Sequence, residues 1–140
     1  LVTNATTAGA VAAYLGVQGA GFPVYRDRPP PGTALPYVTV QEGIAAPFAH
    51  ITTEFDKSLT LQVAEMVQVD LWQTWQNADD TTAEAYANWT NILKILAGSR
   101  LGGLLATNVY GVRFVGRVRL PDLESNTVHD ALTFIIDHDL

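Results

Sequence analysis

The stretches VYGVRFVGRVRL (Val109–Leu120) and TVHDALTFIIDHDL (Thr127–Leu140) decide the fold class of this chain. In both, apolar and polar residues alternate, which is typical of a β-strand with one face on a hydrophobic core. The segment between them, Pro121–Asn126, is rich in turn-forming residues. Together they predict an antiparallel hairpin that covers a core with one face.

The alternation also assigns the side chains of each strand to a face. In the first strand, the residues predicted to face the core are Tyr110, Val112, Phe114, Val118 and Leu120. Its opposite face is predicted to hold Arg113, Arg117 and Arg119. The second strand is predicted to bury Val128, Leu132, Phe134 and Ile136, and to expose His129, Thr133 and Asp137.

Upstream of the hairpin, Leu59–Trp72 is the clearest single strand. One of its faces holds apolar residues, Val63, Val67, Val69 and Leu71. The other face holds Gln62, Gln68, Asp70 and Trp72. The strand is longer than most strands, so a bend or bulge is expected within it. Shorter strands are expected at Phe22–Tyr25 and Tyr37–Gln41.

Two helices are predicted. Thr81-x-x-Glu84 is a capping box, so the main helix is expected at about residues 82–97, followed by Gly98 as its C-cap. Its apolar stripe consists of Tyr86, Trp89, Ile92, Leu93 and Leu96. A short N-terminal helix is expected to begin after a cap at Thr3 or Asn4 and to end near Gly16.

These elements predict an α+β fold, with both helices packed on one face of a mostly antiparallel sheet. The expected organisation is a single domain over residues 1–140. Irregular arms or loops are expected near residues 26–36, which contain three consecutive prolines, and near residues 43–58.

Composition restricts the classes of function. Charged residues make up 16% of the chain, against roughly 25% in soluble domains, which suggests that part of the surface is buried against other chains. A net charge of −6 argues against gripping nucleic acid or anionic membrane. No apolar run is long enough to span a membrane. The absence of cysteine excludes disulfides, thiolate nucleophiles and cysteine-bound metals, and the first residues do not resemble a signal peptide, so cytoplasmic synthesis is expected.

The most chemically suggestive residues are His129-Asp130 and Asp137-His138-Asp139, because imidazole and carboxylate groups together bind metals or move protons. At about 3.3 Å per residue the two histidines are roughly 30 Å apart and on opposite faces of a strand. They cannot share one ion, so a solvated strand end is favoured over a metal-assisted or acid-base enzyme that uses His129, Asp130 or His138. Nucleophile and phosphate-loop motifs are also absent. We expect no catalytic residue, metal or cofactor.

The arginine row Arg113, Arg117 and Arg119 holds three of the eight basic residues of the chain. Three interpretations are open. The row can be solvated and paired with acids of the neighbouring strand, such as Asp130 or Asp137; it can pair with acids of another subunit; or it can contact nucleic acid.

The three tryptophans divide by position. Trp89 belongs to the apolar stripe of the main helix and is expected in the core. Trp72 and Trp75 stand at the polar end of the long strand, so they are candidates for a patch that faces a partner.

Taken in order, several pieces of the chain resemble the tail terminator (tail completion, or tail-to-head joining) family of long-tailed bacteriophages. The resemblance spans about residues 8–137. Its main pieces are Val24–Tyr25, ALPYVTV (Ala34–Val40), VQVDLW (Val67–Trp72), a helix near Ala83–Leu96, VRLPD (Val118–Asp122) and VHDALTF (Val128–Phe134).

The resemblance implies a subunit of a homohexameric ring that caps the tail tube, ends tube polymerisation and offers a surface for head–tail joining. Its implied partners are other copies of the chain, the tail tube protein and head-side connector or neck proteins, with no membrane. DNA would pass through the ring without specific binding, and an acidic wall suits that passage. The protein would be located in the virion, at the head–tail junction, after assembly in the host cytoplasm. The alternatives are another neck, connector or tail-tube-like ring protein, or a generic binding domain.

Overall fold

The computed structural model describes residues 3–42, 48–53, 59–74, 83–122 and 125–139, with the backbone alone described for residues 48–53, 59–61 and 83–87. In chain order the elements are α1 (Thr7–Val17), β1 (Val24–Arg26), β2 (Tyr37–Glu42), β3 (Phe48–Thr53), β4 (Leu59–Thr74), α2 (Ala83–Leu96), the 3₁₀ turn η1 (Leu101–Gly103), β5 (Val109–Asp122) and β6 (Thr127–Asp139).

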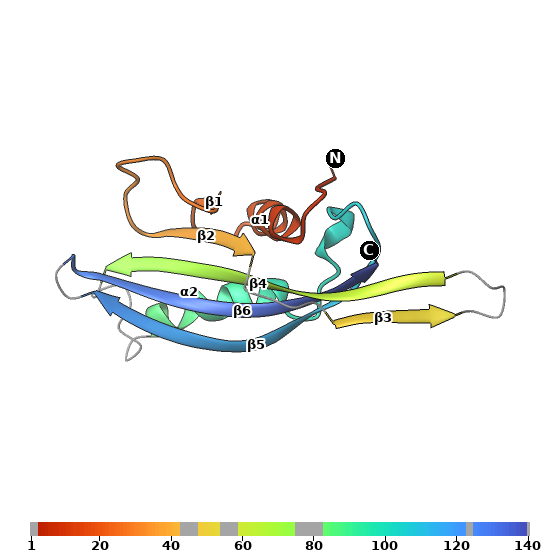
Figure 1. Ribbon diagram of the computed structural model, residues 1–140. Coiled ribbons are helices and arrows are strands. Elements are labelled where there is room, and N and C mark those ends of the chain that lie inside the picture. Colours follow the sequence, from red (N-terminus) through yellow and green to blue (C-terminus); the bar gives the residue numbers. More distant parts are fainter. Residues whose placement is uncertain (1–2, 43–47, 54–58, 75–82, 123–124, 140) are drawn as a thin grey trace.

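The strands form one sheet in the order β1-β2-β4-β6-β5, with β3 beside the first part of β4 (Figure 1). The described pairs are antiparallel apart from β1 with β2. The predicted α+β fold with a mostly antiparallel sheet is confirmed, and so is the hairpin of β5 and β6.

The long strand β4, in which a bend or bulge was expected, pairs with β6 in one continuous register. Its pairing with β6 runs from Gln62 opposite Asp139 to Thr74 opposite Thr127 without a shift. On its other edge β4 has two partners in succession, β3 over residues 59–64 and β2 over residues 67–72. Of the expected bend or bulge, the bulge is absent from the pairing of β4 with β6 in the described residues; the change of partner on the other edge falls between Ala64 and Val67.

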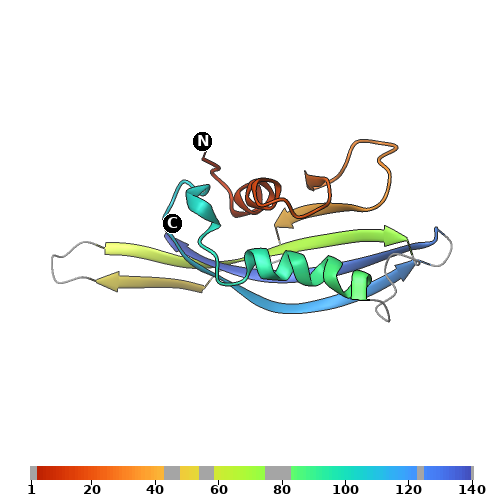
Figure 2. The same cartoon turned by 180° about the vertical axis from the view of Figure 1, so that it is seen from behind.

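Both helices lie on one face of the sheet, as predicted. Figure 2 shows α2 lying along the sheet and α1 next to β1 and β2, and the two helices contact each other. One hydrophobic cluster joins the helices to the inward residues of the sheet; its members include Val11, Leu15, Ile92, Leu96, Val38, Val69, Leu71, Leu132, Phe134 and Ile136. We call this side of the sheet the helix-covered face and the other side, seen in Figure 1, the open face.

The helix ends follow local capping rules. The cap of α1 is Thr6, whose Oγ1 accepts a hydrogen bond from the Gly9 amide at 3.2 Å, so the predicted cap at Thr3 or Asn4 is wrong. Asn4 forms a parallel bridge with Leu105 instead. Helix α2 lies within one residue of its predicted bounds, whereas Thr81 of the capping box is outside the described residues. Gly98 has the predicted left-handed conformation at φ 76°.

The two stretches predicted as irregular differ. Residues 27–36 contain no helix or strand, and we call them the proline arm. The stretch 43–58 contains β3, so its predicted irregularity is wrong at Phe48–Thr53. This strand pairs antiparallel with the start of β4, from Thr53 opposite Leu59 to Phe48 opposite Ala64, so its partner is the next strand along the chain.

Candidate interaction face

Two register shifts in β5 change which side chains face the helices. They lie between Val109 and Gly111 and between Phe114 and Gly116, and each leaves one extra residue in β5, Tyr110 and Val115. After an extra residue the alternation reverses. Val112 and Phe114 lie on the predicted core face and Arg113 on the opposite face, but beyond Val115 the faces are exchanged. The predicted single row of three arginines is therefore wrong, and so is the predicted core position of Val118 and Leu120. Each shift ends at a glycine, and glycine within a strand pattern is the sequence signal for a bulge.

Arg117 and Arg119 lie on the helix-covered face, where they hold Asp130. The Asp130 side chain has no exposed surface. Its Oδ1 accepts from Arg117 Nε at 3.0 Å and Arg119 Nε at 3.1 Å, and its Oδ2 accepts from Arg119 Nη2 at 3.2 Å. The Arg117 guanidinium lies 4.4 Å from the centre of the Trp89 ring, so this cluster also joins α2 to β5.

Arg113 lies on the open face and pairs with Asp137. Arg113 Nε and Nη2 donate to the two carboxylate oxygens at 2.8 and 2.9 Å. These hydrogen bonds and the negative charge of Asp137 raise the pKa of Arg113 above its usual value. Intramolecular pairing with Asp130 and Asp137, one of the three interpretations of the arginines, is thus what the structure shows.

Tyr110, Val118 and Leu120 of β5 are exposed where burial was predicted, whereas Val112 is buried as predicted. Val118 and Leu120 lie opposite Ala131 and His129 on the open face and are 58% and 48% exposed. Of the six large apolar residues that are exposed in the described chain, five lie in β5: Tyr110, Phe114, Val115, Val118 and Leu120. Since β5 pairs only with β6 among the described strands, it is also a free edge of the sheet. An apolar edge strand is a site where another chain can add to a sheet.

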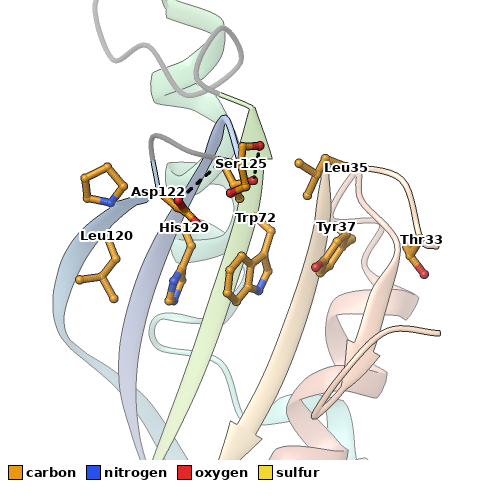
Figure 3. Close-up of a pocket in the computed structure, with 10 residues that line it drawn as sticks. Thr33, Leu35, Tyr37, Trp72, Leu120, Asp122, Ser125 and His129 are labelled. Carbon is orange, nitrogen blue, oxygen red and sulfur yellow. Dashed lines mark hydrogen bonds between the residues drawn. The ribbon is translucent and has the colours of Figure 1, made fainter. Parts of the chain in front are cut away.

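Four rings form a row across the open face, one from each of four neighbouring strands. Tyr25 of β1 meets Tyr37 of β2 edge to face at 6.2 Å, and Tyr37 stacks on Trp72 of β4 at 6.2 Å. Trp72 stacks on His129 of β6 with ring centres 4.1 Å apart. Figure 3 shows the Tyr37, Trp72 and His129 rings side by side on adjacent strands. The row extends the predicted Trp72 patch across the sheet; Trp75 lies outside the described residues.

Above the row lies a cavity of about 500 Å³, which we call the aromatic pocket. Its floor is made of Tyr37, Trp72 and His129. Thr33 and Leu35 of the proline arm line one side (Figure 3). The end of the β5–β6 hairpin lines the other side, with Leu120, Pro121, Asp122, Ser125 and Thr127.

A buried carboxylate lies beside the row. Asp70 is 1% exposed although its face of the sheet has no helix over it. It accepts hydrogen bonds from Gln41 Nε2 at 3.1 Å and Gln68 Nε2 at 2.8 Å, and His129 Nε2 lies 2.7 Å from its Oδ1. The sequence pattern placed Asp70, Trp72 and His129 on the exposed faces of two strands. It could not show that they meet, because that requires knowing that β4 lies beside β6.

The histidines and acids do not combine into a catalytic site. His129 and Asp130 face opposite sides of β6, as do His129 and His138, which confirms that the two histidines cannot share an ion. His138 is buried, with Nε2 3.2 Å from Glu65 Oε1 and Nδ1 3.1 Å from Thr107 Oγ1. The predicted solvated strand end is thus wrong for Asp130 and His138. Among the described residues, no group of three or more His, Asp or Glu side chains is arranged to hold a metal ion.

Comparisons with known proteins give a fold but not a family. No family model and no curated protein matches the sequence. Among solved structures, the chain is similar to a chain from the virion of a native gene transfer agent (GTA) particle, with a TM-score of 0.58 and 17% identity. The similarity covers 93% of this chain and 84% of the other. No helix in the described part of this chain has the length and apolarity that crossing a membrane requires. The chain therefore shares its fold with a component of a virus-like particle.

Proposed function

We propose that this chain is a structural virion protein whose copies form a hexameric ring that caps a phage-type tail tube, ends tube polymerisation and offers a surface for head–tail joining. Two observations support a virion role: the fold is shared with a chain of a gene transfer agent virion, and the ordered sequence pieces resemble tail terminators. The partners in this proposal are other copies of the chain, the tail tube protein and head-side neck proteins.

The observation that carries the proposal is the exposed apolar edge strand β5. Strand edges in monomeric proteins are usually shortened, charged or covered, because an exposed apolar edge recruits other chains. Here the side chains of Val118 and Leu120 are exposed on the open face of a 14-residue edge strand. A surface of this kind is stable in water when a second chain covers it. The low content of charged residues agrees with such burial.

The strand order suits a ring. Among the described strands, β5 forms one edge of the sheet, and β1 and β3 form the opposite edge along different parts of β4, so one subunit presents two different edges on opposite sides. A cyclic ring repeats such a heterologous contact, in which one surface of each copy meets a different surface of the next. A net charge of −6 on every copy gives the ring an acidic field, through which DNA passes without being bound.

The test is to mix the purified protein with tail tubes of the particle that encodes it, and to image the tubes by negative stain. We expect a six-fold ring at one tube end and shorter tubes when the protein is present during polymerisation. The variant with Val118→Asp and Leu120→Asp should fold, by circular dichroism, but should not form rings. Val17→Asp is the matched control, because Val17 is exposed on α1, away from β5. A protein that stays monomeric and binds no tube would overturn the proposal.

The runner-up is another neck or connector protein, or a tail-tube-like ring. The fold supports this alternative as well as it supports a tail terminator, because the similarity to the virion chain does not specify a place in the particle. In the same images, rings that stack on one another would indicate a tube-like protein. Rings that bind purified connectors but not tube ends would indicate a neck protein. An enzyme based on His129 and Asp130 is disfavoured, since the two side chains point to opposite faces.

A further inference from the structure

We infer that the proline arm of one copy docks in the aromatic pocket of the adjacent copy, across that copy's β5 edge. The inference rests on the proposed ring and specifies which surfaces meet in it. The occupant of the pocket is therefore a second copy of this chain, through Pro29–Pro31. Four features of the described residues lead to this pairing: the chemistry of the arm, the chemistry of the pocket, their places on the sheet and their charges.

The arm presents a preformed proline segment to solvent. Pro30 and Pro31 are exposed and Pro29 is half-buried. Proline has a fixed φ, so the segment loses little entropy on binding. The segment ends in a turn at Pro31–Gly32, which is closed by a hydrogen bond from the Thr33 amide to the Pro30 carbonyl at 3.3 Å. The arm is also held by its own contacts, because Thr33 Oγ1 donates to the Pro30 carbonyl at 2.6 Å and the Asp27 amide donates to the Val40 carbonyl at 2.9 Å. Such preorganisation lowers the entropy that docking would otherwise lose.

The aromatic pocket has the surface that recognises proline segments. Proline-rich segments bind in grooves lined by aromatic rings. The Trp72 ring is stacked between Tyr37 and His129, so the edges of these rings, and not their faces, line the pocket. Tyr37 and Trp72 supply two such rings, and both are half-buried, so part of each ring faces outward. The volume of about 500 Å³ falls within the range of about 300–1,000 Å³ that is typical of binding sites for small ligands.

The arm does not fill the pocket of its own chain. Thr33 and Leu35 line one side of that pocket, but Pro29, Pro30 and Pro31 are not among its lining residues. The opposite side is formed by Leu120 and its neighbours at the end of β5. The tip of the arm is therefore free to meet another chain while its base shapes the pocket wall.

The positions of arm and pocket fit a ring. The arm leaves the sheet at the β1–β2 edge (Figure 1), whereas the pocket reaches the end of β5 at the opposite edge, where Leu120 lines it. A neighbour placed beside β5 in the same orientation brings its own β1–β2 edge, with its proline arm, against Val118 and Leu120. The contact is heterologous, so it repeats around a ring, and it covers apolar side chains that are exposed in the single chain.

Charge complementarity favours the same contact. Arg28 precedes the prolines and is exposed. Asp122 lines the pocket at its β5 side and is also exposed, with Oδ1 3.4 Å from the Ser125 amide that donates to it. When Pro29–Pro31 enter the pocket, Arg28 approaches the rim on which Asp122 stands. An arginine–carboxylate pair there would orient the arm more than it would strengthen the contact.

The absence of cysteine allows a direct test by disulfide cross-linking. A chain with Pro30→Cys and a chain with Leu120→Cys are mixed, assembled on tail tubes and oxidised. We expect a linked dimer that contains one chain of each kind, and little linkage when either variant is assembled alone. Lys94→Cys mixed with Leu120→Cys is the control and should give no dimer, because Lys94 is exposed on α2, on the helix-covered face.

The outcomes separate the inference from the proposed function. Rings that form without the Pro30–Leu120 link would overturn the inference and leave the ring intact. Links that form without six-fold rings would support the docking and contradict the hexamer. Linkage of Leu120→Cys chains to each other would overturn the inference, since it would show two β5 edges meeting directly.

A second measurement uses the protein concentration at which half of the tube ends hold a ring. The triple variant Pro29→Ser, Pro30→Ser and Pro31→Ser should raise it at least about tenfold, and Trp72→Ala should do the same. Combining the two changes should add little, because each removes the same contact. Lys94→Gln is the control and should leave assembly unchanged, since Lys94 is exposed on α2, which lies on the helix-covered face. Normal assembly by the triple variant would overturn the inference.

Discussion

Two buried carboxylates, Asp130 and Asp70, lie on neighbouring strands but on opposite faces of the sheet. Asp130 pairs with Leu71, the residue that follows Asp70. Asp130 on the helix-covered face is held by two arginines, one of which lies on the Trp89 ring of α2. Asp70 on the open face is held by two glutamine amides and His129. One carboxylate has permanent cations as partners, and the other has donors that are neutral or only conditionally charged.

The difference shows how each face is stabilised. On the helix-covered face the Asp130 cluster connects β6, β5 and α2, so it helps to hold the elements of one chain together. On the open face the Asp70 cluster connects only strands that are already paired in the ladder, β2, β4 and β6. The open face therefore needs no further element of its own chain, and its aromatic row stays available to another chain.

The largest effect is expected from Asp130→Asn. Asparagine keeps the shape but presents an NH₂ group to arginine side chains that cannot accept a hydrogen bond. Removing one partner of a buried ion pair costs about 3–5 kcal/mol of unfolding free energy. Urea denaturation followed by tryptophan fluorescence measures this loss. A loss below about 1 kcal/mol would show that Asp130 does not hold the two arginines in solution.

The control for Asp130→Asn replaces the whole cluster. Asp130→Leu combined with Arg117→Met and Arg119→Met removes all three charges and fills the space with apolar atoms. We expect most of the lost unfolding free energy to return, because replacing a buried ion cluster with apolar residues is often neutral. If the triple variant is as unstable as Asp130→Asn, the loss of unfolding free energy comes from altered packing and not from unpaired charges.

A smaller effect is expected from Asp70→Asn on the open face. The amides of Gln41 and Gln68 can rotate to present their carbonyl oxygens to the new NH₂ group, which the arginines around Asp130 cannot do. The loss should be about 1–2 kcal/mol, the cost of one imperfectly satisfied buried group. The same denaturation measurement gives the value. If Asp70→Asn costs as much as Asp130→Asn, the two clusters contribute equally and the contrast between the faces fails.

The same contrast explains how much of the fold the sequence specifies. The faces of β6 and β4 are predicted correctly because their mutual pairing keeps one register along its length. The faces of β5 are predicted correctly from Val112 to Phe114 and wrongly beyond Val115, because this extra residue reverses the alternation. A periodic pattern predicts the face of a side chain only where the pairing register is continuous. Where a bulge interrupts the register depends on the partner strand.

The candidate site was predictable in part for the same reason. Trp72 was identified by its position, and Asp130 and Asp137 were identified as partners of the arginines, since neighbouring strands of a hairpin are set by local sequence. The aromatic row joins β1, β2, β4 and β6, which are far apart in the chain. No local pattern gives that strand order, so the meeting of Tyr37, Trp72 and His129 could only be seen in the structure.

A third prediction concerns Arg113, the arginine that the bulge places on the open face. Its pair with Asp137 is exposed to solvent, so Arg113→Ala should lower the unfolding free energy by less than about 1 kcal/mol. Added salt should reduce this difference further by screening the exposed pair. The loss from Asp130→Asn should persist in salt, because Asp130 is buried. A large, salt-resistant loss from Arg113→Ala would contradict the placement of Arg113 on an uncovered face.

The smallest effect on folding is expected from Leu120→Ala, and the matched change is Leu132→Ala on the neighbouring strand. Leu132 is fully buried among the core residues, so its truncation should cost about 2–5 kcal/mol of unfolding free energy. Leu120 is 48% exposed, so its truncation should change that free energy by no more than about 0.5 kcal/mol. Ring formation on tail tubes should show the opposite order among folded variants, with Leu120→Ala impaired. If Leu120→Ala instead destabilises the isolated chain as Leu132→Ala does, Leu120 is already covered within one copy, and the β5 edge is not the free surface that a ring requires.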